Sequence, residues 1–102
     1  MKIINTNEFK ELNKEGYLLV DFFANWCGPC KMLTASLESA DEKFDDVNIV
    51  KIDVDNDKEL AMEFGVMSIP AVFLFKDGQQ IGKFVGYKSA DELINFINDH
   101  RK

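Results

Sequence analysis

Trp26-Cys27-Gly28-Pro29-Cys30-Lys31 holds both cysteines of the chain and joins an apolar run to a helical pattern. A cysteine at the start of a helix meets unpaired backbone N–H groups and the positive end of the helix dipole, and both favour the thiolate. We therefore interpret Cys27 as the candidate nucleophile. Cys30 lies one helical turn further on the same face, so the two sulfurs can close and reopen a small disulfide ring. The stretch predicts a reversible redox switch.

Two other interpretations of the two cysteines are weaker. A structural zinc ion needs four ligands, and beyond Cys27 and Cys30 the chain offers no cysteine and a single histidine, His100. A purely structural disulfide across so short a loop restricts the unfolded chain little. We therefore expect no metal and no separate cofactor, with the Cys27–Cys30 disulfide itself as the redox centre.

The bulk composition narrows the classes of partner. Twelve basic against eighteen acidic residues give a net charge of −6, which argues against nucleic acid and an anionic membrane surface as ligands. The first residues turn polar too early for a secretory signal. The longest purely apolar run, 71–75, is too short to span a bilayer. We expect a cytoplasmic, monomeric protein that acts on other proteins, in a compartment where two such cysteines are catalytic rather than structural.

Hydrophobic periodicity predicts strands that alternate with helices over one domain, residues 1–102. Strands are expected at 2–4, 17–24, 47–54, 71–75 and 80–85. Helices are expected from Asn5 to Gly16, from Gly28 to Phe44, from Asn56 to Gly65 and from Ser89 onward, with Asn5, Asn56 and Ser89 as capping residues. The strand–helix–strand order implies a parallel crossover, so an α/β fold results, a mixed sheet with helices on both faces.

The end of the predicted sheet is a hairpin. Asp77-Gly78 between two apolar runs predicts a tight turn and therefore two antiparallel strands. Gly82, inside the second of these strands, is a candidate β-bulge.

Asp21 interrupts the apolar run of residues 17–24 and has no evident polar side. If it is buried, its pKa rises and it can accept a proton from Cys30; the alternative is an Asp at a strand edge with water beside it. Lys51 lies either on a half-exposed strand face or close to Asp21. Trp26 is either a core aromatic or an exposed platform, and the pattern leaves these alternatives open.

Several further segments, in this order, make the chain resemble the thioredoxin family over essentially its whole length. Besides residues 26–31, these are Val20-Asp21-Phe22, Lys51-Ile52-Asp53-Val54-Asp55, Ser68-Ile69-Pro70, Phe75-Lys76-Asp77-Gly78 and Val85-Gly86. The resemblance implies a thioredoxin fold, with a five-stranded sheet in the order 1-3-2-4-5 and four flanking helices. Ala35, Ala71 and Phe23 depart from the residues most usual in the family, and Ala35 in place of a proline predicts a straighter helix.

The resemblance also implies a mechanism. Cys27 attacks a client disulfide, Cys30, activated through Asp21, resolves the mixed disulfide, and a flavin- and NADPH-dependent thioredoxin reductase restores both thiols. Lys51 becomes a partner of Asp21. Pro70, which base rates alone would make trans, is cis in the family and faces the cysteines. The implied client-docking surface consists of Trp26, Gly28, Pro29, Ile69, Pro70, Val85, Gly86 and Tyr87.

The predicted function is therefore general reduction of protein disulfides. A Gly-Pro pair between the cysteines resembles the reducing members of the superfamily. Two alternatives remain at this stage: a thiol oxidase or isomerase of the same superfamily, and a binding subunit of a larger complex that does not use its thiols.

Overall fold

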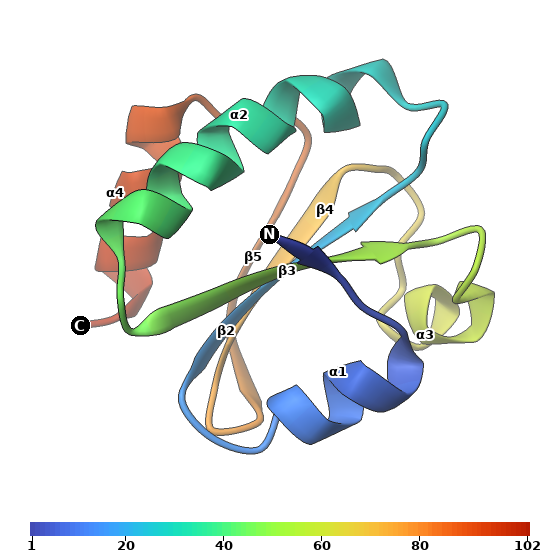
Figure 1. Ribbon diagram of the computed structural model, residues 1–102, viewed down its shortest axis with the longest axis horizontal. Helices are drawn as coiled ribbons and strands as arrows, with labels where there is room; N and C mark the ends of the chain where they lie inside the picture. Colours follow the sequence, from blue (N-terminus) through green and yellow to red (C-terminus); the bar gives the residue numbers. More distant parts are fainter.

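A five-stranded sheet in the order β1-β3-β2-β4-β5 runs through the molecule (Figure 1). The computed structural model describes residues 1–102. Strands β1, β3 and β2 are parallel, whereas β4 is antiparallel to both of its neighbours. The strands are β1 (Lys2–Ile3), β2 (Tyr17–Phe23), β3 (Val47–Asp53), β4 (Ala71–Lys76) and β5 (Gln79–Val85); the helices are α1 (Thr6–Leu12), α2 (Gly28–Lys43), α3 (Lys58–Glu63) and α4 (Ala90–His100). The predicted fold class and strand order are confirmed.

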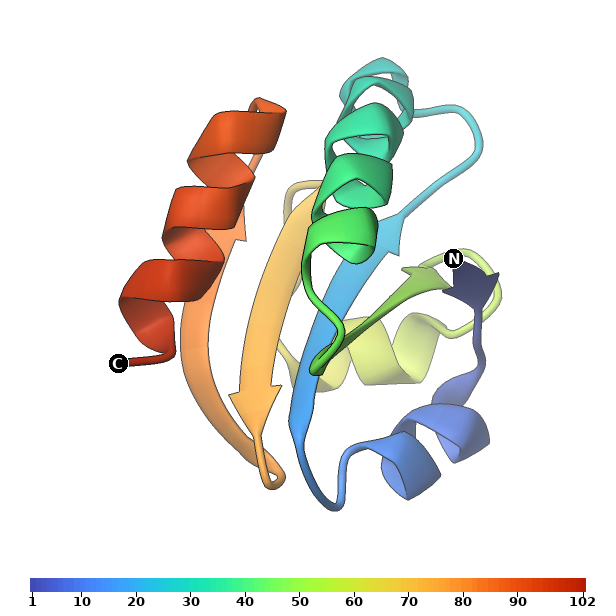
Figure 2. The same cartoon turned by 60° about the vertical axis from the view of Figure 1, so that its left-hand side comes forward.

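Helices cover both faces of the sheet. Figures 1 and 2 show α2 and α4 side by side on one face and α1 and α3 on the other. Strand residues alternate between the two sides, as the pleat requires. Leu19 packs in a cluster with residues of α2 and α4, whereas Leu18 and Val20 pack with Phe9 of α1 and Leu60 of α3. The two apolar cores hold the sheet rigidly between the helices.

Helix α2 carries the redox stretch. Cys27 is its N-cap, Pro29 lies in the first turn, and the helix runs unbroken past Ala35 to Lys43. Proline is tolerated at this place because its missing N–H would lack a partner in any case. Leu33 and Leu37 are fully buried and anchor α2 on the sheet, so the cysteines sit on a fixed support.

Two of the three predicted caps are confirmed and one is wrong. Asn5 and Ser89 form complete capping boxes at α1 and α4. The cap of α3 is Asp57 rather than Asn56, and its side chain makes no capping bond. The carboxylate of Asp57 instead accepts hydrogen bonds from the backbone N–H and the hydroxyl of Thr6, at 3.0 and 2.8 Å. The Asp57 side chain therefore binds a residue of α1 rather than the first turn of its own helix, α3.

Helix α1 also ends earlier than predicted. Its last residue is Leu12, with Asn13 as the C-cap, so Gly16 lies in the loop before β2 rather than at the helix end. The backbone N–H of Gly16 donates to the carboxylate of Asp77 at 2.8 Å. This loop is therefore tied to the β4–β5 turn.

The predicted hairpin is confirmed, with the bulge one residue away from its predicted place. Asp77 and Gly78 both have positive φ, 51° and 84°, which the two-residue turn needs and which glycine adopts readily. The register shifts between Leu74, opposite Gly82, and Phe75, opposite Gln80, so Ile81 is the extra residue. Gly82 serves close packing instead, because a Cβ there would lie 2.6 Å from the His100 ring.

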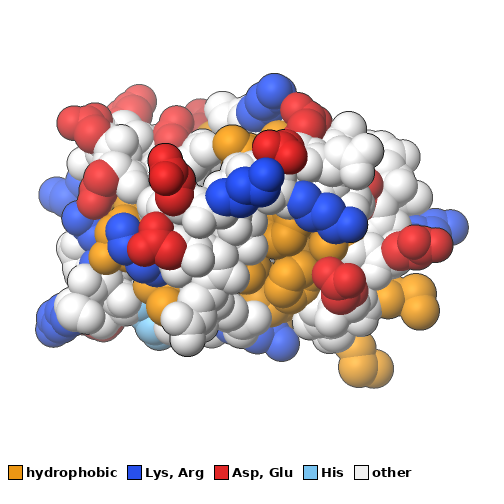
Figure 3. All heavy atoms as spheres, turned by 90° about the horizontal axis from the view of Figure 1, so that it is seen from below, with side chains coloured by type: hydrophobic (Ala, Val, Ile, Leu, Met, Phe, Trp, Pro, Cys, Tyr) orange, Lys and Arg blue, Asp and Glu red, His pale blue; other side chains and the backbone are white.

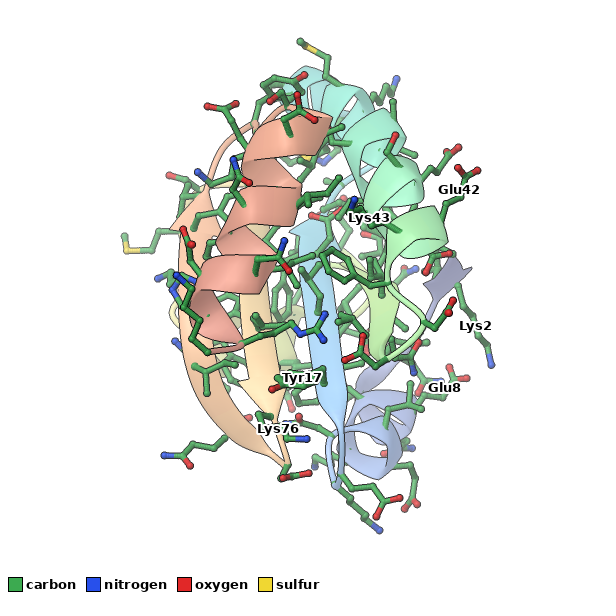
Figure 4. All side chains as sticks on the ribbon, turned by 90° about the vertical axis from the view of Figure 1, so that its left-hand side faces the viewer. Lys2, Glu8, Tyr17, Glu42, Lys43 and Lys76 are labelled. Carbon is green, nitrogen blue, oxygen red and sulfur yellow. A yellow bond between two sulfur atoms is a disulfide. The ribbon has the colours of Figure 1, made fainter.

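Charged side chains of both signs are interspersed on the surface. Figure 3 shows Lys and Arg next to Asp and Glu on one face, with apolar side chains between them. In Figure 4, Lys76 and Tyr17 lie together on neighbouring strands, and the Lys76 ammonium is 4.4 Å from the ring centroid. Lys2 pairs with Glu8 at 3.0 Å. No helix is long and apolar enough to cross a bilayer.

Candidate active site

Cys27 and Cys30 form a disulfide at the start of α2, with their Cα atoms 5.3 Å apart. The backbone N–H of Cys30 donates to the Cys27 sulfur at 3.2 Å. A free N–H at a helix start stabilises negative charge, so the same group would stabilise a Cys27 thiolate after reduction. Both cysteines are nearly covered, with exposed fractions of 5 % for Cys27 and 2 % for Cys30.

The loop before β4 faces Cys27. The Ile69 carbonyl oxygen lies 3.8 Å from the Cys27 sulfur, and the Ile69–Pro70 peptide bond is cis, as the resemblance implied. The Gly86 N–H donates to the Pro70 carbonyl at 2.7 Å, which fastens the end of β5 beside this loop. Val85 and Tyr87, on either side of Gly86, are about half exposed. The loop before β4 thus lies against the disulfide, and the end of β5 lies against that loop.

Trp26 is an exposed platform rather than a core aromatic. Its side chain is 71 % exposed, and its indole N–H donates to the Asp55 carboxylate at 3.0 Å. Gly28 and Pro29, which lie between the two cysteines, are also exposed. Asp55 was not among the predicted site residues, although it lies two residues after β3 and ends the stretch Lys51-Ile52-Asp53-Val54-Asp55 on which the family resemblance partly rests.

Asp21 is completely buried. Leu19 and Phe23, two residues away on either side, pack with α2 and with the cysteines respectively, so Asp21 points to the face that α2 covers. Neither carboxylate oxygen has a hydrogen-bond partner. Burial raises the pKa of Asp21 to about 7, and the positive charge of Lys51 opposes this rise. The carboxyl can therefore change protonation state near neutral pH.

Lys51 lies directly opposite Asp21 in the β2–β3 register. The two side chains nevertheless form no direct ion pair. The Lys51 ammonium donates to the Thr34 hydroxyl at 3.1 Å and lies 4.4 Å from the centroid of the Phe23 ring. Lys51 therefore acts on Asp21 through its charge alone. Thr34 was not predicted, because nothing in its local sequence marks it.

No group of three or more potential metal ligands occurs in the structure. His100 lies on α4, where its Nδ1 is 2.8 Å from the Phe96 carbonyl oxygen and its ring packs on the Phe96 ring. The donor set around the cysteines is thus two sulfurs, one buried carboxyl and one ammonium. Two cysteines that can open and close a disulfide are the groups that thiol–disulfide exchange requires.

Comparison with known proteins decides the family. The family model described as Thioredoxin matches residues 1–99. The chain belongs to the thioredoxin family. A thioredoxin from Chlamydia caviae is 44 % identical over 98 % of both chains, and one from Bacillus subtilis is 45 % identical over 90 % of this chain and 89 % of its own.

Solved thioredoxin structures agree with this membership. A mutant thioredoxin from Halobacterium salinarum is 34 % identical and superposes with a TM-score of 0.90, over 100 % of this chain and 90 % of its own. Like other members of the thioredoxin family, the chain is a dithiol–disulfide oxidoreductase that reduces disulfides, and Cys27–Cys30 is its redox-active pair.

Proposed function

We propose that the chain reduces protein disulfides in two steps, the first of which is an attack by Cys27. The observation that carries this assignment is the Cys30 N–H directed at the Cys27 sulfur at the start of α2. The Cys27 thiolate attacks one sulfur of a client disulfide, a new S–S bond joins Cys27 to the client, and the other client sulfur leaves as a thiolate and takes up a proton.

In the second step Cys30 resolves the mixed disulfide. Its thiol loses a proton to the Asp21 carboxylate, and the thiolate attacks the Cys27 sulfur. The second client sulfur leaves, and the Cys27–Cys30 disulfide forms. Two electrons have then passed from the dithiol to the client. The role of Asp21 is supported by its burial on the α2 side of the sheet and by a pKa near neutrality.

Clients dock on the apolar surface around the disulfide. This docking surface comprises Trp26, Gly28, Pro29, Ile69, Pro70, Val85, Gly86 and Tyr87. Its parts adjoin through the Ile69 carbonyl beside Cys27 and the Pro70–Gly86 hydrogen bond. We propose that an extended client segment pairs with the backbone of this loop, in the manner of strand addition.

A thioredoxin reductase reduces the Cys27–Cys30 disulfide back to two thiols, with two electrons that pass from NADPH through its flavin. We propose that the chain works in the cytoplasm as a monomeric single domain, with neither nucleic acid nor membrane as a partner. Mixed with a bacterial thioredoxin reductase, NADPH and insulin, the protein should sustain NADPH oxidation, followed by absorbance. The Cys27→Ser variant should show none; sustained oxidation by that variant would contradict the first step.

A Trp26→Ala variant should lower kcat/KM toward a protein client by about tenfold, which corresponds to a loss of about 1.4 kcal/mol for an aromatic anchor in a docking surface. The free energy of unfolding should change little, since Trp26 is 71 % exposed. Ile3→Ala is the matched control, an exposed apolar residue on the edge strand β1. An equal loss of kcat/KM in both variants would show that clients do not dock on Trp26. A small aromatic disulfide serves as a second substrate, because its reduction reports on the chemistry of the cysteines without protein docking.

A further inference from the structure

The hydroxyl of Thr34 connects two parts of the active site. Thr34 lies one turn after Cys30 on α2, and its Oγ1 lies 3.3 Å from the Cys30 carbonyl oxygen and 3.1 Å from the Lys51 ammonium nitrogen. The two contacts differ in kind. A threonine hydroxyl has one proton and two lone pairs, whereas an ammonium group can only donate.

The directions of both hydrogen bonds follow from these donors and acceptors. Lys51 must donate to Thr34, so the hydroxyl proton is free to point to the Cys30 carbonyl, the usual bond of a helical threonine to the residue four positions earlier. The hydroxyl therefore presents a lone pair to Lys51 from a fixed direction. A lysine side chain is otherwise flexible and strongly hydrated, so this hydrogen bond and the Phe23 ring 4.4 Å away together fix where the Lys51 charge lies.

Thr34 and Lys51 both line a small pocket that Cys30 also lines. The pocket has a volume of about 90 Å³ and is lined by Phe23, Ala24, Asn25, Cys30, Lys31, Thr34 and Lys51. We propose that Thr34 is a positioning residue for the second step of disulfide exchange: its hydroxyl fixes the Lys51 ammonium between the resolving cysteine and the buried Asp21 carboxyl. This inference rests on the roles proposed above for Cys30 and Asp21.

Few other charges act on this arrangement. Strand β4 places an apolar residue, Val72, opposite Asp21. Helix α2 adds the two cysteines and the exposed Lys31, and β3 adds Asp53 two residues beyond Lys51, where it accepts a hydrogen bond from the Asp55 backbone at 2.9 Å. Lys51 is thus the cation opposite Asp21 in the sheet, and besides its contact with the Phe23 ring its ammonium makes one side-chain hydrogen bond, to the Thr34 hydroxyl.

The hydrogen bond between Thr34 and Lys51 affects proton transfer from Cys30 to Asp21. The positive charge of Lys51 favours the ionised form of Asp21, which is the form that accepts the Cys30 proton. Without the Thr34 hydroxyl, the ammonium moves into water and its effect on Asp21 weakens. The pKa of Asp21 then rises, and a smaller fraction of the protein is ready to accept a proton at pH 7.

The test uses three variants of the full chain. Thr34→Val removes the hydroxyl and keeps the shape of the side chain, whereas Thr34→Ser keeps the hydroxyl. Thr34→Ala also removes the hydroxyl, and because alanine has a higher helix propensity than valine, it serves if valine disturbs folding. Thr6→Val is the matched control, because the Thr6 hydroxyl donates to Asp57 on the other face of the sheet. The Asp21 carboxyl carbon is followed by NMR in the oxidised proteins from about pH 5 to about pH 9, a range that brackets a raised carboxyl pKa.

In Thr34→Val and Thr34→Ala the Asp21 titration midpoint should rise by about half a pH unit, the effect of one unit charge withdrawn across a partly solvated distance. Resolution of a preformed mixed disulfide should slow about twofold at pH 7 and be unchanged well above the midpoint. Thr34→Ser and Thr6→Val should match the wild type. An unchanged midpoint would show that Thr34 has no such role, and a lowered one that it keeps Lys51 away from Asp21; either overturns the proposal.

The same data separate this inference from the proposed function. If the wild-type rate of resolution does not follow the Asp21 titration, the role of Asp21 itself fails. If it does follow the titration but the Thr34 variants behave as the wild type, only the positioning role of Thr34 fails.

Discussion

A Cys30→Ser variant should accumulate as a covalent mixed disulfide with client proteins through Cys27. The first step needs only the Cys27 thiolate, which keeps its helix-start position in this variant. The second step needs a thiol one turn away, and serine cannot supply a sulfur. Steady-state reduction of a client disulfide should therefore fall by on the order of 10³-fold or more, the scale of losing an essential nucleophile.

The trapped species identifies the attacking residue. Mass spectrometry of the digested complex should find the client cysteine joined to the peptide that contains Cys27. The Cys27→Ser variant is the matched control and should trap far less, because the helix-start N–H that stabilises a thiolate is directed at the Cys27 sulfur and not at that of Cys30. Efficient trapping by Cys27→Ser, with linkage to Cys30, would reverse the two roles.

An Asp21→Asn variant should be more stable than the wild type above neutral pH. Asp21 has a folded pKa of about 7 against 3.8 for the unperturbed group, so the folded state binds more protons than the unfolded state between these values. The contribution of Asp21 to wild-type stability therefore falls as pH rises from about 4 to about 7 and then levels off. The difference corresponds to about 4 kcal/mol. Asparagine cannot ionise, so this slope should disappear.

Chemical denaturation at a series of pH values measures this slope directly. Asp53→Asn is the control, a second buried carboxylate on the sheet that accepts hydrogen bonds from Asp55 and Asn56. It should lose stability and keep the wild-type slope between pH 4 and pH 7. The same slope in Asp21→Asn as in the wild type would contradict the burial of an ionisable Asp21.

The Asp21→Asn variant should reduce client disulfides more slowly than the wild type, although it is more stable. Without the Asp21 carboxylate, resolution of the mixed disulfide by Cys30 should slow by at least about tenfold near pH 7, the lower part of what a positioned general base contributes. Attack by Cys27, measured as the rate of mixed-disulfide formation in a Cys30→Ser background, should be little affected. A loss confined to the first step would assign Asp21 to Cys27 instead.

Local patterns predicted the helices and strands well. The apolar repeat of α2, the capping boxes at Asn5 and Ser89 and the Asp77-Gly78 turn depend on neighbours within a few residues, so the sequence displays them directly. The buried Asp21 was visible as a polar residue in an apolar run. Its conflict with the pattern marked it as a candidate functional residue.

Contacts between residues far apart in the sequence could not be predicted from the local hydrophobic pattern. Asp57 binds Thr6 across 51 residues, Asp55 binds Trp26 across 29, and Thr34 binds Lys51 across 17. Each depends on the packing of elements whose relative positions periodicity does not encode. The cis Ile69–Pro70 bond likewise followed from family resemblance, since base rates alone favour trans.

The equilibrium reduction potential of the Cys27–Cys30 pair tests the central claim most directly, because it fixes the direction of electron flow. The protein is equilibrated with dithiothreitol buffers of known potential, and the fraction of free thiols is measured. A disulfide reductase should have a potential near that of thioredoxin, about −270 mV, which is more negative than the potential of the glutathione pool as measured by extraction, about −220 to −260 mV. A potential well above that pool would contradict the account, because the pair would then oxidise its clients rather than reduce them.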